Sequence, residues 1–456
     1  MSKKISLHAL AAALCCASAL STPAGAAEQD AARLGADLTP VGAEKAGNKE
    51  GSIPAYGGTR MPPPTGWKVG AKPVNPYAGE KPLYVIEAGN IDKYKDKLSD
   101  GQQALVKTMP GYRMEVYPAH RSCGYPDFVA EQTKKNLSVA KLDAENGLAD
   151  AVGGGIPFPL PKSGAEAIWN HKLRYNGESI DTTYTQVVPP KGASGKNIGE
   201  VQVYHDQLLY PMASAAVKSA AEVKGVEFGF REQTLAPSSV AGDGVQAYYF
   251  LDKPTEVNLY FSAQRRMRRA PTYQYDAPVL NTDNLATIDQ AWMFNGLLDR
   301  YDFKLAGKRE LLIPYNNFPL YDHTLQAEDV YAGNYMARDK VRYELHRVWV
   351  VEATIKAGKR HSMPKRTFYI DEDSWTIVTA DLYDNAGKLW RSQEAYLVPE
   401  YALGACYLSG TAIYDVQAGR YMAANVLAGA GKPTTFSRDY KLEDFSVDAV
   451  RRWVAR

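Results

Sequence analysis

The chain between residues 341 and 397 alternates apolar and polar side chains, which predicts consecutive β-strands. In its first segment the mostly apolar odd positions are Val341, Tyr343, Leu345, Arg347, Trp349, Val351, Ala353 and Ile355, and the even positions are largely charged. A period of two is typical of a strand with one buried and one solvent-exposed face. Further strand patterns cover 366–371, 375–384 and 389–397, with turn residues between them and no helical pattern. These segments predict an antiparallel meander.

Strand patterns also occur earlier in the chain, at 181–188, 200–210, 226–234, 246–251 and 257–267. A turn at 252–255 joins the last two into a predicted hairpin. Short helices are predicted at 90–108, 164–171 and from Ser446 onward, and a longer helix is predicted at 127–152. The sequence therefore predicts a mostly β (α+β) fold, in which a curved antiparallel sheet forms an incomplete barrel with short flanking or plugging helices.

The first 26 residues have the pattern of a secretory signal peptide. Lys3 and Lys4 precede an apolar run, and Ala24-Gly-Ala26 is typical of a cleavage site. Export of this kind predicts a periplasmic protein, in some cases associated with the outer membrane. We expect residues 27–160 to form an N-terminal arm and a helical segment, and residues 161–456 to form the half-barrel with a C-terminal hairpin and helix.

Composition narrows the class of function. The chain has 53 Lys and Arg against 51 Asp and Glu, and loss of Lys3 and Lys4 would make the mature chain neutral. No general electrostatic attraction to nucleic acid is therefore expected. In the N-terminal arm, Leu38, Val41, Ile53 and Tyr56 are too apolar for a free tail, so the arm should lie across the barrel.

The search for reactive groups finds no catalytic pattern. The seven His residues are scattered, and no metal-binding or nucleophile motif is present, so we expect no metal, no cofactor and no enzyme activity. A hydrolase using Asp371 and Asp373 is the less favoured alternative. Cys123 and Cys406 remain after signal removal; whether they form a disulfide is open at this stage.

Three motifs in the meander resemble a known family. They are Arg342–Trp349, Lys365–Trp375 and Tyr383–Trp390, and the segment from Leu38 to Asn48 is similar to the N-terminal signature of the same family. That Gram-negative family has unknown function and is described as similar to outer-membrane lipoprotein-sorting proteins of the LolA/LolB type. The resemblance implies a half-open barrel that holds acyl chains on its concave face. It also implies a periplasmic binding or carrier protein for a lipid or other hydrophobic molecule, serving an outer-membrane protein or an RND-type transporter.

We expect the ligand to contact apolar residues of two strands on the concave face: Tyr343, Leu345, Trp349, Val351, Tyr260 and Phe261. The competing possibility is that helices between residues 90 and 152 fill the concavity as an ordinary core. A non-transporting adaptor of an envelope complex is the alternative function. A deep apolar pocket would favour the carrier, and an exposed apolar patch would favour the adaptor.

A basic run, Arg265-Arg266-Met267-Arg268-Arg269, ends the predicted hairpin and allows two interpretations. Alternation would place two arginines on each face, where the candidate partners are Asp299, Asp302, Asp371 and Asp381. Alternatively, the four arginines contact anionic headgroups or a partner protein, since guanidinium groups bind phosphate and carboxylate in a bidentate manner.

Overall fold

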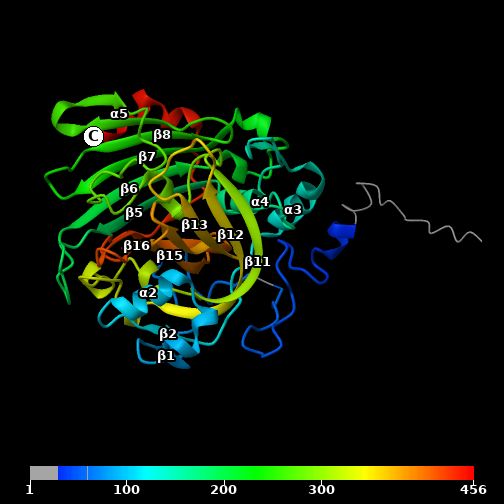
Figure 1. Ribbon diagram of the computed structural model, residues 1–456. Coiled ribbons are helices and arrows are strands. Elements are labelled where there is room, and N and C mark those ends of the chain that lie inside the picture. Colours follow the sequence, from blue (N-terminus) through cyan, green and yellow to red (C-terminus); the bar gives the residue numbers. More distant parts are fainter. Residues whose placement is uncertain (1–28, 59, 456) are drawn as a thin grey trace, which may run out of the picture.

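The computed structural model describes residues 29–58 and 60–455 (Figure 1). The predicted signal peptide lies outside the described residues. Among the helices that are described, none combines the length and the apolar composition needed to cross a membrane.

In the described part of the chain, sixteen strands form one curved sheet. Its main path runs β1-β2-β12-β13-β14-β15-β16-β17-β5-β6-β7-β8-β9-β10, with β11 paired to β12 and β18 paired to β5. The strands are β1 Tyr84–Ile86, β2 Met114–Val116, β5 Ser179–Val187, β6 Val201–Leu209, β7 Val226–Ala236, β8 Gly244–Phe250, β9 Glu256–Phe261, β10 Arg266–Arg269, β11 Tyr301–Pro314, β12 Arg342–Ile355, β13 Lys365–Asp371, β14 Ile377–Tyr383, β15 Leu389–Glu400, β16 Ala405–Asp415, β17 Arg420–Val426 and β18 Thr435–Phe436. A separate hairpin consists of β3 Lys141–Leu142 and β4 Leu148–Asp150. The path does not close on itself, so the predicted incomplete barrel is confirmed.

The helices of the described chain include α2 Asp100–Thr108, α3 Asp127–Val139, α4 Gly164–Leu173 and α5 Val447–Val454. The 3₁₀ turns are η1 Ile91–Lys93, η2 Lys95–Lys97, η3 Pro211–Ala213, η4 Ala220–Val223, η5 Ser262–Gln264, η6 Ile288–Met293, η7 Phe318–Tyr321, η8 Ala327–Asp329, η9 Arg338–Lys340 and η10 Leu442–Phe445. The predicted capping box of Ser99 and Gln102 starts α2. The N-terminal residues of α2 donate two backbone hydrogen bonds to the buried Asp381 carboxylate of β14, which fixes the helix on the sheet.

The helix predicted at 127–152 is only half correct. It ends at Val139, and the following residues form the β3–β4 hairpin. Asp143 accepts hydrogen bonds from the backbone N–H groups of Glu145 and Gly147, and Asn146 has a φ of 67°. Side-chain hydrogen bonds of this kind stabilise a tight turn at the expense of a helix, which explains the error.

β12 is buried on both faces, whereas the alternation predicted one solvent-exposed face. Its even-numbered Glu344, His346 and Val348 are at most 1% exposed. The reason is that the sheet curls so strongly that β11 contacts β14 and β15. The charged groups inside this curl are paired, as Arg342 and Glu344 are.

The N-terminal arm is ordered and packs on the sheet, as its apolar residues predicted. Leu38, Val41 and Ile53 are buried. The indole N–H of Trp375 donates a hydrogen bond of 2.9 Å to the backbone oxygen of Val41, which joins the arm to the β13–β14 turn.

Cys123 and Cys406 form a disulfide, which settles the alternative that the sequence left open. Their Cα atoms are 5.2 Å apart and the residues are separated by 283 positions. The bond joins the segment before α3 to the start of β16. Disulfides persist in oxidising compartments, which agrees with the predicted export.

Replacing both cysteines by serine is expected to lower the free energy of unfolding by about 2–5 kcal/mol, because the bond restricts the unfolded chain over a very long loop. Denaturant unfolding of the oxidised protein and of the Cys123→Ser/Cys406→Ser variant measures this difference. An unchanged midpoint would contradict a stabilising role.

Candidate ligand-binding cavity

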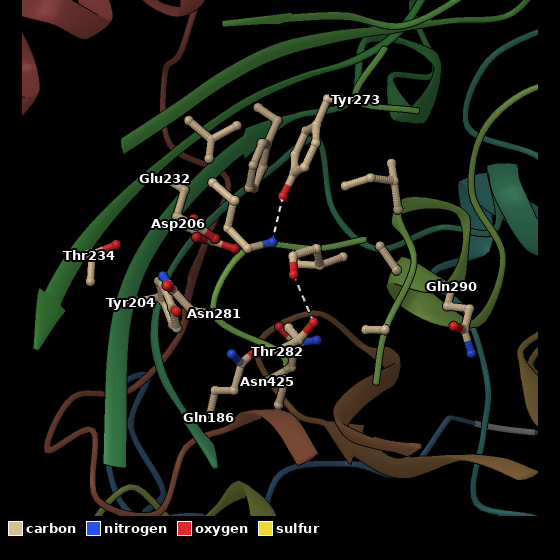
Figure 2. Close-up of a pocket in the computed structure, with 18 of the residues that line it drawn as sticks. Gln186, Tyr204, Asp206, Glu232, Thr234, Tyr273, Asn281, Thr282, Gln290 and Asn425 are labelled. Atoms are coloured by element: carbon tan, nitrogen blue, oxygen red, sulfur yellow. Dashed lines mark hydrogen bonds between the residues drawn. The ribbon is translucent and has the colours of Figure 1, made fainter. Parts of the chain in front are cut away.

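A cavity of about 320 Å³ lies between the sheet and a long connection (Figure 2). Strands β5 to β9, together with β16 and β17, supply its wall on the sheet side. The opposite wall belongs to residues 273–292, which we call the cover segment. This segment belongs to the connection between β10 and β11 in the sequence and forms no strand of the sheet. Many of its residues line the cavity.

Most of the cavity wall is aromatic or aliphatic. The apolar lining residues include Phe230, Val245, Tyr249, Val257, Leu259, Tyr260, Phe261, Val279, Ile288, Trp292, Ile413 and Met422. Trp292 stands edge-on to Phe228 and Phe230, with ring centroids 5.5 and 5.8 Å apart. Such edge-to-face contacts hold the rings in place and leave the space beside them apolar.

Three acidic residues interrupt this apolar wall, Asp206, Glu232 and Asp243, and the first two form a pair. Asp206 of β6 and Glu232 of β7 are directly opposite each other across the strand pair. The hydroxyl of Tyr184 donates a hydrogen bond of 3.1 Å to Glu232 Oε2. Among the described residues, Asp206 Oδ1 has no hydrogen-bond partner. The labelled side chains in Figure 2 show this polar group facing the cavity together with Tyr204, Gln186 and Asn425.

Burial and mutual repulsion set the charge of this pair. Burial raises the pKa of Asp206 well above its ordinary range, and the adjacent Glu232 raises it further. Burial also raises the pKa of Glu232 to about 7, although hydrogen bonds from Tyr184 and Asp206 oppose the shift. Two carboxyl groups in contact hold a shared proton more readily than two negative charges, so near neutral pH the pair carries at most one charge.

The cover segment is held by a buried ion pair at its C-terminal end. Asp289 Oδ2 lies 2.6 Å from an Arg366 guanidinium nitrogen and 2.8 Å from His361 Nε2. Two further side chains on β15 support the segment: Arg391 donates to the Gln290 side chain at 3.0 Å, and Gln393 donates to the Gln290 backbone oxygen at 2.8 Å. Within the segment, Tyr273 and Thr282 make the two hydrogen bonds drawn in Figure 2.

Comparison with known proteins places the chain in a family. A family model described as "Protein of unknown function (DUF1329)" matches residues 85–451. The chain belongs to this family. An uncharacterized protein of Pseudomonas aeruginosa is 39% identical to it over 456 residues, which is 98% of each chain. The family resemblance predicted from the sequence motifs is thereby confirmed.

Three solved structures have partial similarity to this DUF1329 chain. A domain described provisionally as an outer membrane lipoprotein-sorting protein from Vibrio parahaemolyticus has 14% identity and a TM-score of 0.45, covering 64% of this chain and 99% of that domain. A DUF1329 family protein from Desulfovibrio piger has 12% identity and a TM-score of 0.41, and the match covers 60% of this chain and 92% of that protein. A LolA superfamily protein from Nitrosomonas europaea has 12% identity and a TM-score of 0.35, and the match covers 63% of this chain and 99% of that protein. At these identities and TM-scores, the names of those proteins assign no function to this chain.

The structure places the predicted ligand-binding residues of this DUF1329 protein in two different regions. Tyr260 and Phe261, on β9, line the cavity. Tyr343, Leu345 and Val351, on β12, are buried in cores that contain residues of the helices. Trp349 is partly buried, stacked on Trp375 and covered by the Lys308 ammonium group. Those four are not among the cavity-lining residues.

All four arginines of the basic run are exposed. Arg265 lies in the turn between β9 and β10, and Arg266, Arg268 and Arg269 lie on β10. In the described chain no carboxylate lies within 4.0 Å of these guanidinium groups, so the predicted pairing with Asp299, Asp302, Asp371 or Asp381 is wrong. Arg268 instead donates to the Gln264 side chain at 2.6 Å. The strand is an edge of the sheet, where charged side chains remain in solvent.

Sequence reasoning did not find Asp206, Glu232 or the cover segment. Each acid has a polar residue on both sides in the sequence of β6 or β7. Such a polar stretch is as typical of a solvent-exposed strand as of a cavity wall. The cover segment has no periodic apolar pattern. The available signal was the length of the connection between two strands, because long loops without secondary structure are often functional.

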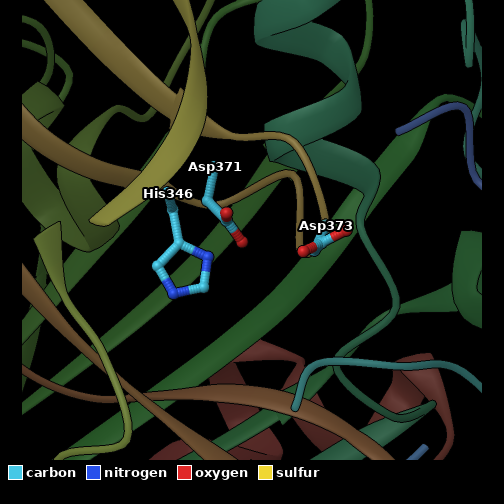
Figure 3. Close-up of side chains that lie close together, drawn as sticks. All are labelled: His346, Asp371 and Asp373. Atoms are coloured by element: carbon cyan, nitrogen blue, oxygen red, sulfur yellow. The ribbon is translucent and has the colours of Figure 1, made fainter. Parts of the chain in front are cut away.

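A second cluster lies away from the cavity, within the curl of the sheet. Ligand atoms of His346, Asp371 and Asp373 are all within 4.8 Å of one another (Figure 3). One imidazole and two carboxylates are suitable ligands for a divalent cation. However, Asp373 already receives two hydrogen bonds from Arg121, at 2.7 and 2.8 Å. Arg121 thus supplies the positive charge that a cation would bring, and the cluster joins β12 to the β13–β14 turn.

Proposed function

We propose that this protein binds a lipid or another hydrophobic molecule in the cavity beneath the cover segment, as a carrier in the cell envelope. The observation that carries the proposal is the cavity itself, which encloses about 320 Å³ and has a mainly apolar wall with a few convergent polar groups. Ligand sites of small molecules typically have this size and this composition.

Periplasmic location is part of the proposal. It is supported by the predicted signal peptide of residues 1–26. The disulfide between Cys123 and Cys406 also supports it, because such bonds are rare in reducing compartments.

Transfer of the ligand to a membrane component also belongs to the proposal. Tyr260 and Phe261 line the cavity, and the exposed Arg265, Arg266, Arg268 and Arg269 follow directly on the same hairpin. Clustered exposed arginines are suited to anionic headgroups or to an acidic partner surface. We propose this hairpin as the contact region with an outer-membrane protein or an RND-type transporter.

A fluorescent apolar probe tests the binding step. N-Phenyl-1-naphthylamine is expected to bind the wild-type protein with micromolar affinity, corresponding to about 8 kcal/mol. Leu259→Asp places a charge in the cavity wall and is expected to weaken binding at least about tenfold, since an unpaired charge is poorly solvated there.

The matched control is Leu235→Asp, which changes a leucine of β7 that is 41% exposed and does not line the cavity. This variant should bind like the wild type, and circular dichroism should show both variants folded. Folded wild-type protein that takes up no acyl, sterol or aromatic probe would refute the carrier function. It would also leave the adaptor function as the better account.

A further inference from the structure

Next to the ligand cavity lies a second, smaller cavity of about 50 Å³, which we call the polar chamber. Asp206, Trp292 and Asn425 contribute to the walls of both cavities, so the two are neighbours. The walls of the polar chamber include three basic side chains, His171, Lys172 and Arg174, around the end of α4. Its composition is therefore unlike that of the apolar cavity.

Arg174 is the group in the chamber that lacks a counter-ion. It is only 8% exposed, and among the described residues no carboxylate lies within 4.0 Å of its guanidinium group. The neighbouring Lys172 shows the contrast, since its ammonium group is 3.0 Å from the buried Glu227 carboxylate. A buried cation without an anion is unfavourable, because the interior does not replace the water that solvated it.

The protein contacts of Arg174 do not supply the missing charge. One guanidinium nitrogen donates to the backbone oxygen of His171. The imidazole of His171 accepts from the backbone N–H of Ile377 at Nδ1 and lies 3.0 Å from the backbone oxygen of Trp292 at Nε2. Burial and the charge of Arg174 hold the pKa of His171 well below its usual value. His171 is thus neutral and does not compensate Arg174.

Other polar atoms in the chamber wall also lack partners within the described chain. They are Asn295 Nδ2, Asn176 Oδ1 and Asp206 Oδ1, together with Glu227 Oε2, which has only its ion pair with Lys172. Buried amide and carboxyl atoms are nearly always hydrogen-bonded in folded proteins. An unpaired guanidinium, an unpaired amide donor and an unpaired carboxyl oxygen therefore all lie around the same small space, which indicates a polar ligand group.

We propose that the polar chamber binds the carboxylate of an amphiphilic ligand through Arg174, while the apolar chain of that ligand occupies the adjoining cavity. This inference rests on the proposed function and adds the ligand class, a long-chain carboxylic acid. The planar guanidinium matches a carboxylate in bidentate geometry. The chamber has room for a carboxylate group.

Two ligands with the same chain and different heads test the proposal: dodecanoate and 1-dodecanol, measured below their aggregation limits at pH 7.5. The wild-type protein is expected to bind dodecanoate about ten- to a hundredfold more tightly, the usual range for hydrogen bonds to a charged group. Arg174→Gln should remove this preference and leave the affinity for 1-dodecanol unchanged. Arg174→Lys should retain part of the preference, because it keeps the charge and loses the bidentate geometry.

Arg269→Gln is the matched control, since it removes an exposed arginine from the same protein and should leave the preference intact. If Arg174→Gln does not fold, two other measurements test the proposal. One is the preference of Arg174→Lys, and the other is a ¹³C NMR titration of the carboxyl group of dodecanoic acid bound to the wild-type protein. The bound acid should titrate below its free pKa. If 1-dodecanol binds without any preference for dodecanoate, the chamber proposal is wrong and the carrier function stands. If neither ligand binds, both are wrong.

Discussion

Asp289→Asn is expected to lower the free energy of unfolding by about 3–5 kcal/mol, the range found when one partner of a buried ion pair is removed. The Asp289 carboxylate lies 2.6 Å from Arg366, whose side chain is fully buried. The other two guanidinium nitrogens of Arg366 have no hydrogen-bond partner in the described chain, where Asp289 is the one carboxylate that pairs with this buried charge. Denaturant unfolding of both proteins measures the loss.

A charge pair at the surface of the same cover segment is the control. Asp283 is 2.6 Å from Arg420, but its side chain is 65% exposed. Asp283→Asn should therefore cost at most about 1 kcal/mol. Equal losses in the two variants would show that burial of the Asp289 pair is not what stabilises the segment.

Acid unfolding gives a second readout for Asp289. Burial alone raises its pKa, but the charge of Arg366 and the hydrogen bond from His361 outweigh burial, so its pKa lies below the ordinary value. The stabilisation is therefore present above the unfolded-state pKa of an aspartate and is lost as the pH falls toward the lower folded-state pKa. The wild type should lose this part of its stability on acidification, whereas Asp289→Asn should lack the dependence.

The strand meander could be predicted from the sequence because its signal is local. Alternation with a period of two and turn residues determined β12 to β15 within a few residues. The burial of both faces of β12 could not be predicted in this way. It results from the strong curl of the sheet, which brings β11 against β14 and β15, and curvature leaves no mark on the pattern of a single strand.

The two competing accounts of the concave face each describe one part of the structure. α2 and α3 contribute residues to the cores that bury Tyr343 and Val351, as the filled-core alternative predicted, and α4, which lies outside the helices named by that alternative, packs in the same core as Val351. Beyond β16 the sheet is covered by an irregular segment, and the cavity lies there. An apolar stripe has the same appearance in a sequence whether a helix or a ligand covers it, so the pattern of β12 did not distinguish them.

Tyr260 and Phe261 were within reach of sequence analysis because they end a clearly patterned hairpin. Asp206, Glu232 and Arg174 were not, since each depends on a long-range neighbour. Asp206 and Glu232 meet across a strand pair, and Arg174 is singled out by the lack of a carboxylate around it. The absence of a counter-ion around a buried side chain is a property of the folded structure, and the sequence pattern does not show it.

Affinity for an uncharged apolar probe should fall as the pH rises above about 7, by up to about tenfold per pH unit. The cause is the Asp206–Glu232 pair in the cavity wall, where burial raises the pKa of Glu232 to about 7. Below that pH the pair holds its protons and the wall is close to neutral. Above it, a bound apolar molecule would keep water from a newly formed carboxylate, so ionisation and binding oppose each other.

N-Phenyl-1-naphthylamine suits this measurement, because its own charge does not change between pH 6 and about 9 and the protein alone titrates. Two tyrosines face the pair: Tyr184 donates to Glu232, and burial raises the pKa of Tyr184 and Tyr204 above the ordinary value, so both stay neutral in this range. Asp206 also borders the polar chamber with His171, Lys172, Arg174 and Glu227, and Asp243 lines the apolar cavity. The double variant Asp206→Asn/Glu232→Gln, which removes both carboxyl groups of the pair, should bind the probe with nearly constant affinity across the same pH range. Because asparagine and glutamine have almost the same shapes as the acids that they replace, a profile that still falls in this double variant would assign the pH dependence to another group.

The same pair should make the wild-type protein less stable as the pH rises from about 4.5 to 7. An acid with a raised folded-state pKa binds more protons when folded than when unfolded in that window, so the free energy of unfolding decreases with pH there. A ligand that excludes water strengthens the protonated state of the pair. Saturating probe should consequently extend the fall in stability to higher pH, and it should have no such effect in the double variant Asp206→Asn/Glu232→Gln. A shift of equal size in both proteins would show that the probe binds outside this cavity.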